Sequence, residues 1–402
     1  MERPIDLAAE PRRLETLAPR ALRTAGGLGV VGLVAALIQG ILTEEGMHRF
    51  YHAYLVNLCY FLSLSLGALF FVMLQHLTRA GWSVVIRRFA EGLTAPLPML
   101  AVLCIPILVG RHELYSWTRS GLVAEDHLLQ LKQPYLNTTF FIIRLAACFA
   151  IWMLLARFFF ANSVRQDMTG DVNLTLRMQA ISGPGMVLFA ITLTVAAVDL
   201  LMSLDPHWYS TIFGVYYYAG GVVGFFALLA LVVFLAQSSG RLPRVITIEH
   251  YHDMGKLIFA FVVFWAYIAF SQYLLIWYAN IPEETVWFLH RQDGDWGVMS
   301  LVLLFGHFVV PFLALISRRA KRRKASVAVT AVWVLSMHWL DIYWLVMPGV
   351  SEGHLGLSLM DLTCFIGIGG LFVATAVLAL REHSLIPARD PRLIESLTFE
   401  NV

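Results

Sequence analysis

Two aspartates occupy matching positions in two long apolar stretches of this 402-residue chain. Asp199 and Asp341 each stand six intervening residues before a proline, Pro206 and Pro348. An ionisable side chain inside an apolar membrane segment is costly, so such residues usually face a bundle interior, a water path or a partner. The pair therefore indicates a duplicated helical bundle that handles protons or a polar ligand.

A histidine accompanies the second aspartate. His338 lies three residues before Asp341, so the two side chains share one face of a helix. Because histidine titrates near neutral pH, this spacing predicts a coupled proton pair. His307 is predicted at a similar depth, and two facing histidines could ligate a b-type haem. The alternative is a hydrogen-bonded core histidine or a second member of a proton relay.

Arg144 and Asp361 are predicted near the same depth as the aspartate pair. If the helices bring them together, Arg144 forms an ion pair with one of the aspartates. That pair would either lock two helices or belong to a proton path or quinone headgroup site. Snorkelling toward the interface is the competing explanation for Arg144 and Asp361.

Further polar residues fall into three groups along the chain. A quinone pocket needs apolar walls and a few hydrogen-bonding groups, and aromatic interface belts supply similar residues in any membrane protein. A water chain could join an inner entrance to the outer acids, although a solvated loop and a packing stripe explain the same residues. The groups are Ser203, Asp205 and His207; Ser271, Gln272 and Tyr273; and Glu249, His250, His252 and Asp253.

Composition identifies the elements that must position these residues. Hydrophobic residues make up 58% of the chain and charged residues 14%, against roughly 25% charged in soluble domains. A helix of about 20 apolar residues crosses a bilayer, so we predict an all-α polytopic membrane protein. The expected spans are roughly 25–42, 54–74, 93–110, 138–160, 184–203, 211–236, 256–279, 299–316, 326–346 and 359–380.

The basic residues predict the orientation of these spans. Lys and Arg concentrate in alternate loops, most densely between Arg318 and Lys324, and such loops are usually cytoplasmic. This predicts a cytoplasmic arm over 1–24, a membrane domain over 25–380 and a cytoplasmic tail over 381–402. The four cysteines form no Cys-x-x-Cys or c-type haem motif, so we expect no iron–sulfur cluster or covalent haem in this chain.

A weak internal repeat accompanies the aspartate pair. Gln75 and Arg79 have the same spacing as Gln237 and Arg241, each pair at the end of a predicted span. The repeat predicts two four-helix bundles over 54–203 and 211–346, related by an axis along the membrane normal. The first and last spans would then be peripheral.

Residues 203–220 and 264–284 resemble the F-subunit family (ActF) of bacterial alternative complex III, within the wider NrfD/PsrC-like membrane group. The resemblance implies a ten-helix, haem-free subunit of a quinol:cytochrome c oxidoreductase in the bacterial inner membrane, inactive alone. It implies a proton path, with quinone or menaquinone as a ligand still open. Implied partners are the paralogous C subunit, the iron–sulfur B subunit, c-type cytochromes that carry the haem, and small membrane subunits. It assigns importance to Asp199, Ser203, Asp205, His207, Ser271, Gln272 and Tyr273.

Two other functions remain open at the level of sequence. A parallel repeat with polar residues in the membrane is also typical of an independent secondary transporter. However, Pro96, Pro98 and Pro106 have no counterparts in the corresponding span of the second half. The chain could instead be a structural anchor whose buried acids serve only helix packing.

Overall fold

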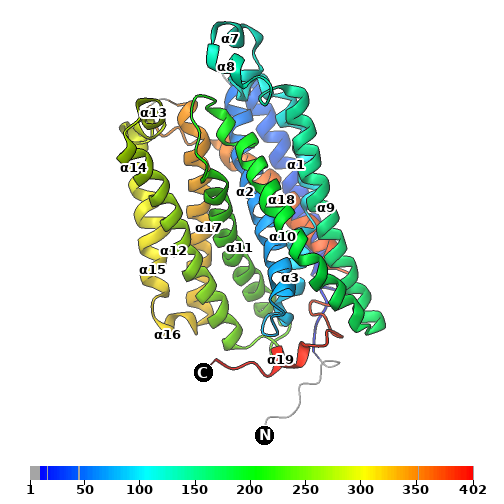
Figure 1. Ribbon diagram of the computed structural model, residues 1–402. Coiled ribbons are helices and arrows are strands. Elements are labelled where there is room, and N and C mark those ends of the chain that lie inside the picture. Colours follow the sequence, from blue (N-terminus) through cyan, green and yellow to red (C-terminus); the bar gives the residue numbers. More distant parts are fainter. Residues whose placement is uncertain (1–9, 16, 44–45, 352, 402) are drawn as a thin grey trace.

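The computed structural model describes residues 10–15, 17–43, 46–351 and 353–401 (Figure 1). Regular secondary structure within these ranges is entirely helical, and ten of their helical segments are long and apolar enough to cross a membrane. The prediction of an all-α polytopic membrane protein is therefore confirmed.

The membrane-spanning segments comprise single helices and several broken ones. Seven spans are dominated by one helix each: α1 (Ala18–Leu42), α2 (Gly46–Leu77), α9 (Thr138–Thr169), α10 (Val172–Leu200), α11 (Phe213–Ser238), α12 (Ile248–Ala279) and α18 (Leu359–Leu380). The others are α3 (Val84–Thr94) with α4 (Leu97–Leu103) and α5 (Ile105–Val109); α14 (Gly294–Val302) with the π-helix η3 (Leu303–Val309) and α15 (Val310–Leu315); and α17 (Lys324–Val346) with η4 (Met347–Gly349).

Short helices connect the spans. They are α6 (Arg111–Leu114), η1 (Ser116–Thr118), α7 (Ser120–Glu125), α8 (His127–Lys132), η2 (Met202–Leu204), α13 (Pro282–His290), α16 (Arg318–Lys321) and α19 (Leu393–Leu397). We call the end of the molecule that carries α7, α8 and α13 the hairpin end. The opposite end, which carries α16 and α19, is the termini end (Figure 1).

Several helices are longer than their predicted spans. α10 begins at Val172 rather than near 184, and α2 covers Gly46–Leu77 rather than 54–74. An apolar window detects only the stretch that matches the hydrocarbon thickness, so polar helical turns beyond it are missed. The third span is interrupted near Pro96 and Pro106, because proline lacks the N–H that an α-helix needs in its interior.

α2 lies at the centre of the helix packing. It contacts α3, α10, α11, α17 and α18, while α9 packs on α10 and α12 on α11. α1 packs along α18 at the periphery, where a Cβ on Gly32 would lie 2.6 Å from the backbone nitrogen of Gly367. The division into two four-helix bundles stays a prediction, as do the boundaries drawn from it.

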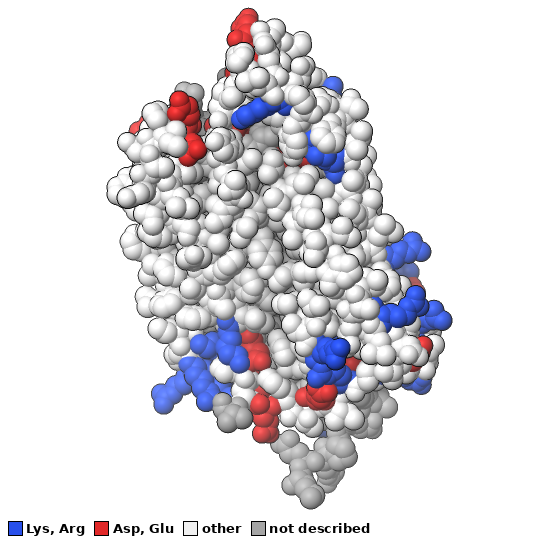
Figure 2. Space-filling model, viewed as in Figure 1, with Lys and Arg blue, Asp and Glu red and all other residues white. Residues whose placement is uncertain are grey.

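The C-terminal segment is packed against the termini end. Leu385 and Ile386 are fully buried, and Asp390 forms a buried ion pair with Arg87 of α3. Lys and Arg side chains cluster around this end in the space-filling view, and few appear over the middle of the molecule (Figure 2). The membrane orientation predicted from the basic residues stays a prediction.

Candidate functional site

Asp341 of α17 is buried among neutral hydrogen-bond donors. Its exposed fraction is 1%. The Tyr216 hydroxyl of α11 donates to Oδ1, and the Trp265 indole N–H of α12 donates to Oδ2 at 3.1 Å. Among the described residues no lysine or arginine forms a salt bridge with it. This carboxyl group can therefore gain or lose a proton without breaking an ion pair to a fixed cation.

His338 lies one turn before Asp341 and is fully buried. Its Nδ1 is 4.0 Å from Asp341 Oδ2, and its Nε2 is 2.8 Å from the Ser63 hydroxyl oxygen of α2. Ser63 donates its own proton to the Tyr60 carbonyl at 2.7 Å, so its oxygen accepts from Nε2–H. This assigns the neutral tautomer in which Nδ1 is the free acceptor facing Asp341.

Two glycines of α11 let this helix approach the His338 ring. A Cβ on Gly220 would lie 3.0 Å from His338 Cε1 and 3.3 Å from Asp341 Oδ2. A Cβ on Gly224 would lie 2.7 Å from His338 Cδ2. The space for the histidine and the aspartate therefore depends on the absence of two side chains.

His307 joins the same cluster from the π-helix η3. It is fully buried, and neither of its ring nitrogens has a hydrogen-bond partner in the part of the chain that the structure describes. Its ring centroid lies 4.0 Å from that of Trp265 and 6.3 Å from that of His338. π-Helical turns occur frequently at functional sites, and a buried polar group without a partner requires an explanation. Three titratable side chains thus converge in the interior.

A large cavity adjoins the donors of Asp341. It has a volume of about 790 Å³ and lies between α12, α13, α14 and η3. Tyr216 and Trp265 form part of its wall, together with Gln272 and Tyr273, and most of the remaining lining is apolar. Small-molecule sites typically enclose about 300–1,000 Å³ with apolar walls and a few polar groups. The cavity therefore has the size and wall of a site for a lipid-soluble ligand next to the Asp341 cluster.

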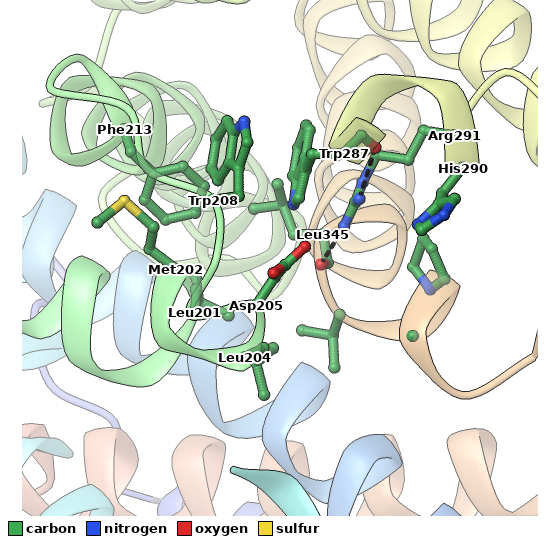
Figure 3. Close-up of a pocket in the computed structure, with 13 residues that line it drawn as sticks. Leu201, Met202, Leu204, Asp205, Trp208, Phe213, Trp287, His290, Arg291 and Leu345 are labelled. Carbon is green, nitrogen blue, oxygen red and sulfur yellow. Dashed lines mark hydrogen bonds between the residues drawn. The ribbon is translucent and has the colours of Figure 1, made fainter. Parts of the chain in front are cut away.

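Arg291 lines both this cavity and a smaller one at the hairpin end, and Figure 3 shows its place in the smaller one. Its guanidinium donates to the carbonyls of Trp287, Trp344 and Leu345 at 3.0, 3.2 and 2.9 Å. It also lies 3.4 Å from the Trp287 ring centroid. Burial lowers the pKa of Arg291.

The smaller cavity has a volume of about 70 Å³ and is lined by Asp205, Trp208 and His290, among others (Figure 3). A water molecule needs only about 10–15 Å³ of such space, so water fits between these side chains and Arg291. The Trp208 indole nitrogen is buried and has no partner among the described residues. Of the predicted group Ser203, Asp205 and His207, Asp205 lines this cavity.

Asp199 has a different environment from Asp341. Arg144 binds both of its carboxylate oxygens, through Nε at 2.8 Å and Nη2 at 2.9 Å. The guanidinium also lies 3.8 Å from the Tyr135 ring centroid. Ser203 donates to the Asp199 backbone carbonyl at 2.6 Å. The pairing of Arg144 with an aspartate is present, and it joins α9 to α10 as a bidentate salt bridge.

The other predicted residues lie apart from the Asp341 cluster. His207 is 2.6 Å from Asp126 on the surface of the hairpin end, and Ser271 does not line the large cavity. Asp361 pairs with Arg49 at 2.6 Å. At the termini end, Glu249 pairs with Arg322, Asp253 with Lys256, His252 lies 4.0 Å from Asp253, and His250 caps α12. The structure does not bring these residues together with Gln272 and Tyr273.

Sequence reasoning missed the partners that distinguish the two aspartates. Tyr216, Trp265 and Ser63 belong to separate helices, and each reads as an ordinary aromatic or packing residue. Arg291 falls in a predicted loop, where basic residues are common. Only the glycines gave a local indication of close helix packing in the sequence. Gly220, Gly221 and Gly224 lie within five positions of one helix, where glycine is destabilising.

Within the described ranges, no group of three or more His, Cys, Asp or Glu side chains is placed to hold a metal ion. A scan against protein-family models and a search of curated proteins each found no match to this chain. The case for a function therefore rests on the residues, on their geometry and on the resemblance of residues 203–220 and 264–284 described above.

Proposed function

We propose that this chain is a proton-conducting, haem-free membrane subunit of a respiratory quinol:cytochrome c oxidoreductase of the alternative complex III type. The observation that carries this proposal is the environment of Asp341. A buried carboxyl group with only neutral donors, next to a histidine with a free ring nitrogen, is suited to proton transfer.

The proposed transfer uses atoms that the fold already places close together. Protonated Asp341 gives its proton to His338 Nδ1 across the 4.0 Å gap, after a small side-chain movement or through one water molecule. Ser63 holds the opposite nitrogen and so keeps the ring oriented. Tyr216 and Trp265 stabilise the carboxylate that remains.

The large cavity supports quinone binding as a second part of the proposal. A quinone fits its volume of about 790 Å³ and its apolar wall, and Gln272, Tyr273 and Arg291 supply hydrogen-bonding groups. A quinol bound there would supply protons on oxidation. In this chain, Tyr216 and Trp265 would connect the headgroup to Asp341, and electrons would pass to partner subunits.

The remaining elements of the proposal come from the family resemblance. The chain would work in the bacterial inner membrane with a paralogous C subunit, an iron–sulfur B subunit, c-type cytochromes and small membrane subunits. An independent transporter and a structural anchor are the alternatives. The polar cluster around Asp341 favours a role in transfer over a purely structural one, because packing alone does not require it.

The test compares Asp341→Asn with Asp199→Asn in the complex purified gently from its native membrane. We expect Asp341→Asn to assemble with cytochrome and iron–sulfur subunits but to lose most proton release per quinol oxidised. We expect Asp199→Asn to assemble poorly and to keep normal coupling in the fraction that assembles. Normal turnover and coupling in Asp341→Asn would reject the relay.

The same preparation tests the alternatives. If the wild-type chain is recovered alone, without haem or iron, the respiratory assignment is wrong. Solute transport by the chain alone in liposomes would then establish a transporter. Loss of assembly in both aspartate variants, with normal coupling in the assembled remainder, would establish an anchor.

A further inference from the structure

A second large cavity lies along a different face of α17 from the His338 and Asp341 side chains, and Tyr60 of its wall lies 5.3 Å from the His338 ring, centroid to centroid. It has a volume of about 630 Å³ and is formed by α2, α11, α17 and α18. Both α17 and α18 pack on α2, so α2 contributes the floor of a groove between them. Several residues of its wall are strongly exposed, including Val332 at 50%, Leu357 at 57% and Leu362 at 52%. The groove therefore opens sideways through the apolar surface that a bilayer would cover.

The groove has the length of one acyl chain. Its wall on α18 extends from Asp361 to Val373, which is roughly 18 Å along a helix. One leaflet of a bilayer has a hydrocarbon thickness of about 15 Å. Apart from Tyr60, Ser336, Ser358, Trp339 and Asp361, the wall is entirely hydrocarbon or phenyl, as an acyl chain requires.

An incompletely bonded carboxylate stands at the hairpin end of this groove. Asp361 is 2% exposed. Its Oδ2 accepts from Arg49 Nη2 at 2.6 Å and from the Ser358 backbone N–H at 2.8 Å. Its Oδ1 is buried and has no partner among the described residues. A buried carboxylate oxygen without a donor is costly, so a ligand that donates a hydrogen bond would stabilise this end.

Arg49 adds a positive charge beside Asp361, so the ligand should carry a negative group as well as a hydrogen-bond donor. It is the ion-pair partner of Asp361 and also donates to Tyr343 and the Gly356 carbonyl. Its side chain is 16% exposed and contacts Asp361, which lines the groove, so a positive charge lies beside the carboxylate. An adjacent cation and anion complement a headgroup that itself carries both charges. A phosphate would face Arg49, and an ammonium with N–H donors would face Asp361.

We propose that the groove between α17 and α18 binds phosphatidylethanolamine, with an acyl chain along α18 and the ammonium hydrogen-bonded to Asp361 Oδ1. Phosphatidylcholine has the same charges but no N–H donor. A quinone carbonyl accepts hydrogen bonds and cannot satisfy Oδ1. The lipid would join α17 and α18 at the side of the molecule away from the large cavity of the relay.

The test measures which lipids stay bound to the full-length chain. The chain is reconstituted in nanodiscs with equal amounts of phosphatidylethanolamine and phosphatidylcholine of matched acyl chains, extracted mildly, and weighed by native mass spectrometry. We expect about a tenfold preference for the ethanolamine lipid, the effect of one hydrogen bond to a charged group. Equal retention of both lipids, or an isoprenoid quinone in the groove, would overturn the proposal.

Variants separate the groove from the rest of the surface. Ser336→Trp fills the groove from an exposed position and should abolish retention. Val329→Trp, on the same helix, 71% exposed and outside the groove wall, is the matched control and should retain the lipid. Asp361→Asn should keep binding but lose the preference over choline. Ser336 is not part of an ion pair, so Ser336→Trp still tests the site if Asp361→Asn does not fold. Undiminished retention in Ser336→Trp would refute the site, as would stronger retention of phosphatidylglycerol than of phosphatidylethanolamine in nanodiscs that contain equal amounts of these two lipids.

Discussion

A carboxylate inside a membrane protein must be offset by a cation, by hydrogen bonds or by a proton. Asp199 and Asp341 occupy corresponding places in the sequence but differ in this respect. Arg144 holds Asp199 through two parallel hydrogen bonds, a geometry that fixes both charges. Among the described residues, Asp341 accepts hydrogen bonds from the neutral donors Tyr216 and Trp265 and pairs with no lysine or arginine. The first arrangement suits a structural joint, and the second suits a group that changes its protonation.

This difference predicts the stability of variants at Asp199. Asp199→Asn leaves the buried Arg144 charge without its counterion, which typically lowers the free energy of unfolding by about 3–5 kcal/mol. The double variant Arg144→Met, Asp199→Leu removes both charges and should recover most of that loss. Unfolding monitored in detergent measures both effects. If the double variant is no more stable than Asp199→Asn, then the ion pair stabilises the fold by more than the mutual neutralisation of two buried charges.

At the scale of the helix, two glycines of α11 allow it to pack closely against α17. Its Gly220 and Gly224 face the His338 ring, and the clearance is too small for a methyl group. Glycine in a helix interior costs up to about 1 kcal/mol relative to alanine. The helix therefore gives up intrinsic stability at the place where the His338 side chain needs space.

Gly224→Ala should disturb the relay without unfolding the chain. Its Cβ would lie 2.7 Å from His338 Cδ2 and 2.9 Å from Leu64 Cδ2, so the imidazole must leave its present position beside Ser63 and Asp341. We expect proton release to fall by about tenfold or more, as for a misplaced general base. The matched control is Gly27→Ala in α1, where no atom lies within 4 Å of the new Cβ. Equal coupling in the two variants would contradict a role for the His338 position.

The stability of the short helix α8 at the hairpin end should depend on pH, because Asp126 caps its N-terminus. Slight desolvation raises the pKa of Asp126, but hydrogen bonds from His207 and from the Leu128 and Leu129 amides outweigh it and hold the pKa below its usual value. A depressed carboxyl pKa stabilises the folded form above the unfolded value of about 3.9, and this is lost as the pH falls below it.

Hydrogen exchange of the Leu128 and Leu129 amides measures this effect. Between about pH 5 and pH 3 their protection should fall in the wild type. In Asp126→Asn, which keeps an uncharged N-cap, protection should not depend on this titration. Parallel behaviour of the two proteins would show that Asp126 does not control the hairpin.

The sequence predicts the helices far better than it predicts the contacts among them. The length of each hydrophobic stretch predicts every span, since crossing a bilayer constrains each segment separately. The helical spacing also predicts that His338 lies beside Asp341, because both residues lie on one helix. The sequence does not predict Tyr216 or Trp265 as partners of Asp341, since they are 125 and 76 positions away from it. Such pairs depend on how helices rotate and pack, which one sequence does not encode locally.

At the scale of the whole molecule, the two ends differ in charge and in covering. The termini end carries most of the basic residues and is covered by the C-terminal segment through the Asp390–Arg87 ion pair (Figure 2). The hairpin end carries α7, α8 and α13 and the small cavity at Asp205. Basic residues favour the cytoplasmic side, so protons leaving Asp341 toward Asp205 would emerge on the opposite side.

Labelling of single cysteines tests that direction. The native Cys59, Cys104, Cys148 and Cys364 are all buried, so an introduced surface thiol reports without interference from them. Glu125→Cys places a thiol on exposed α7, and Ser239→Cys places one at the exposed turn after α11. In intact cells a membrane-impermeant maleimide should label Glu125→Cys about tenfold faster or more, and both variants equally after lysis. Preferential labelling of Ser239→Cys would invert the orientation, and the route past Arg291 would then lead protons inward.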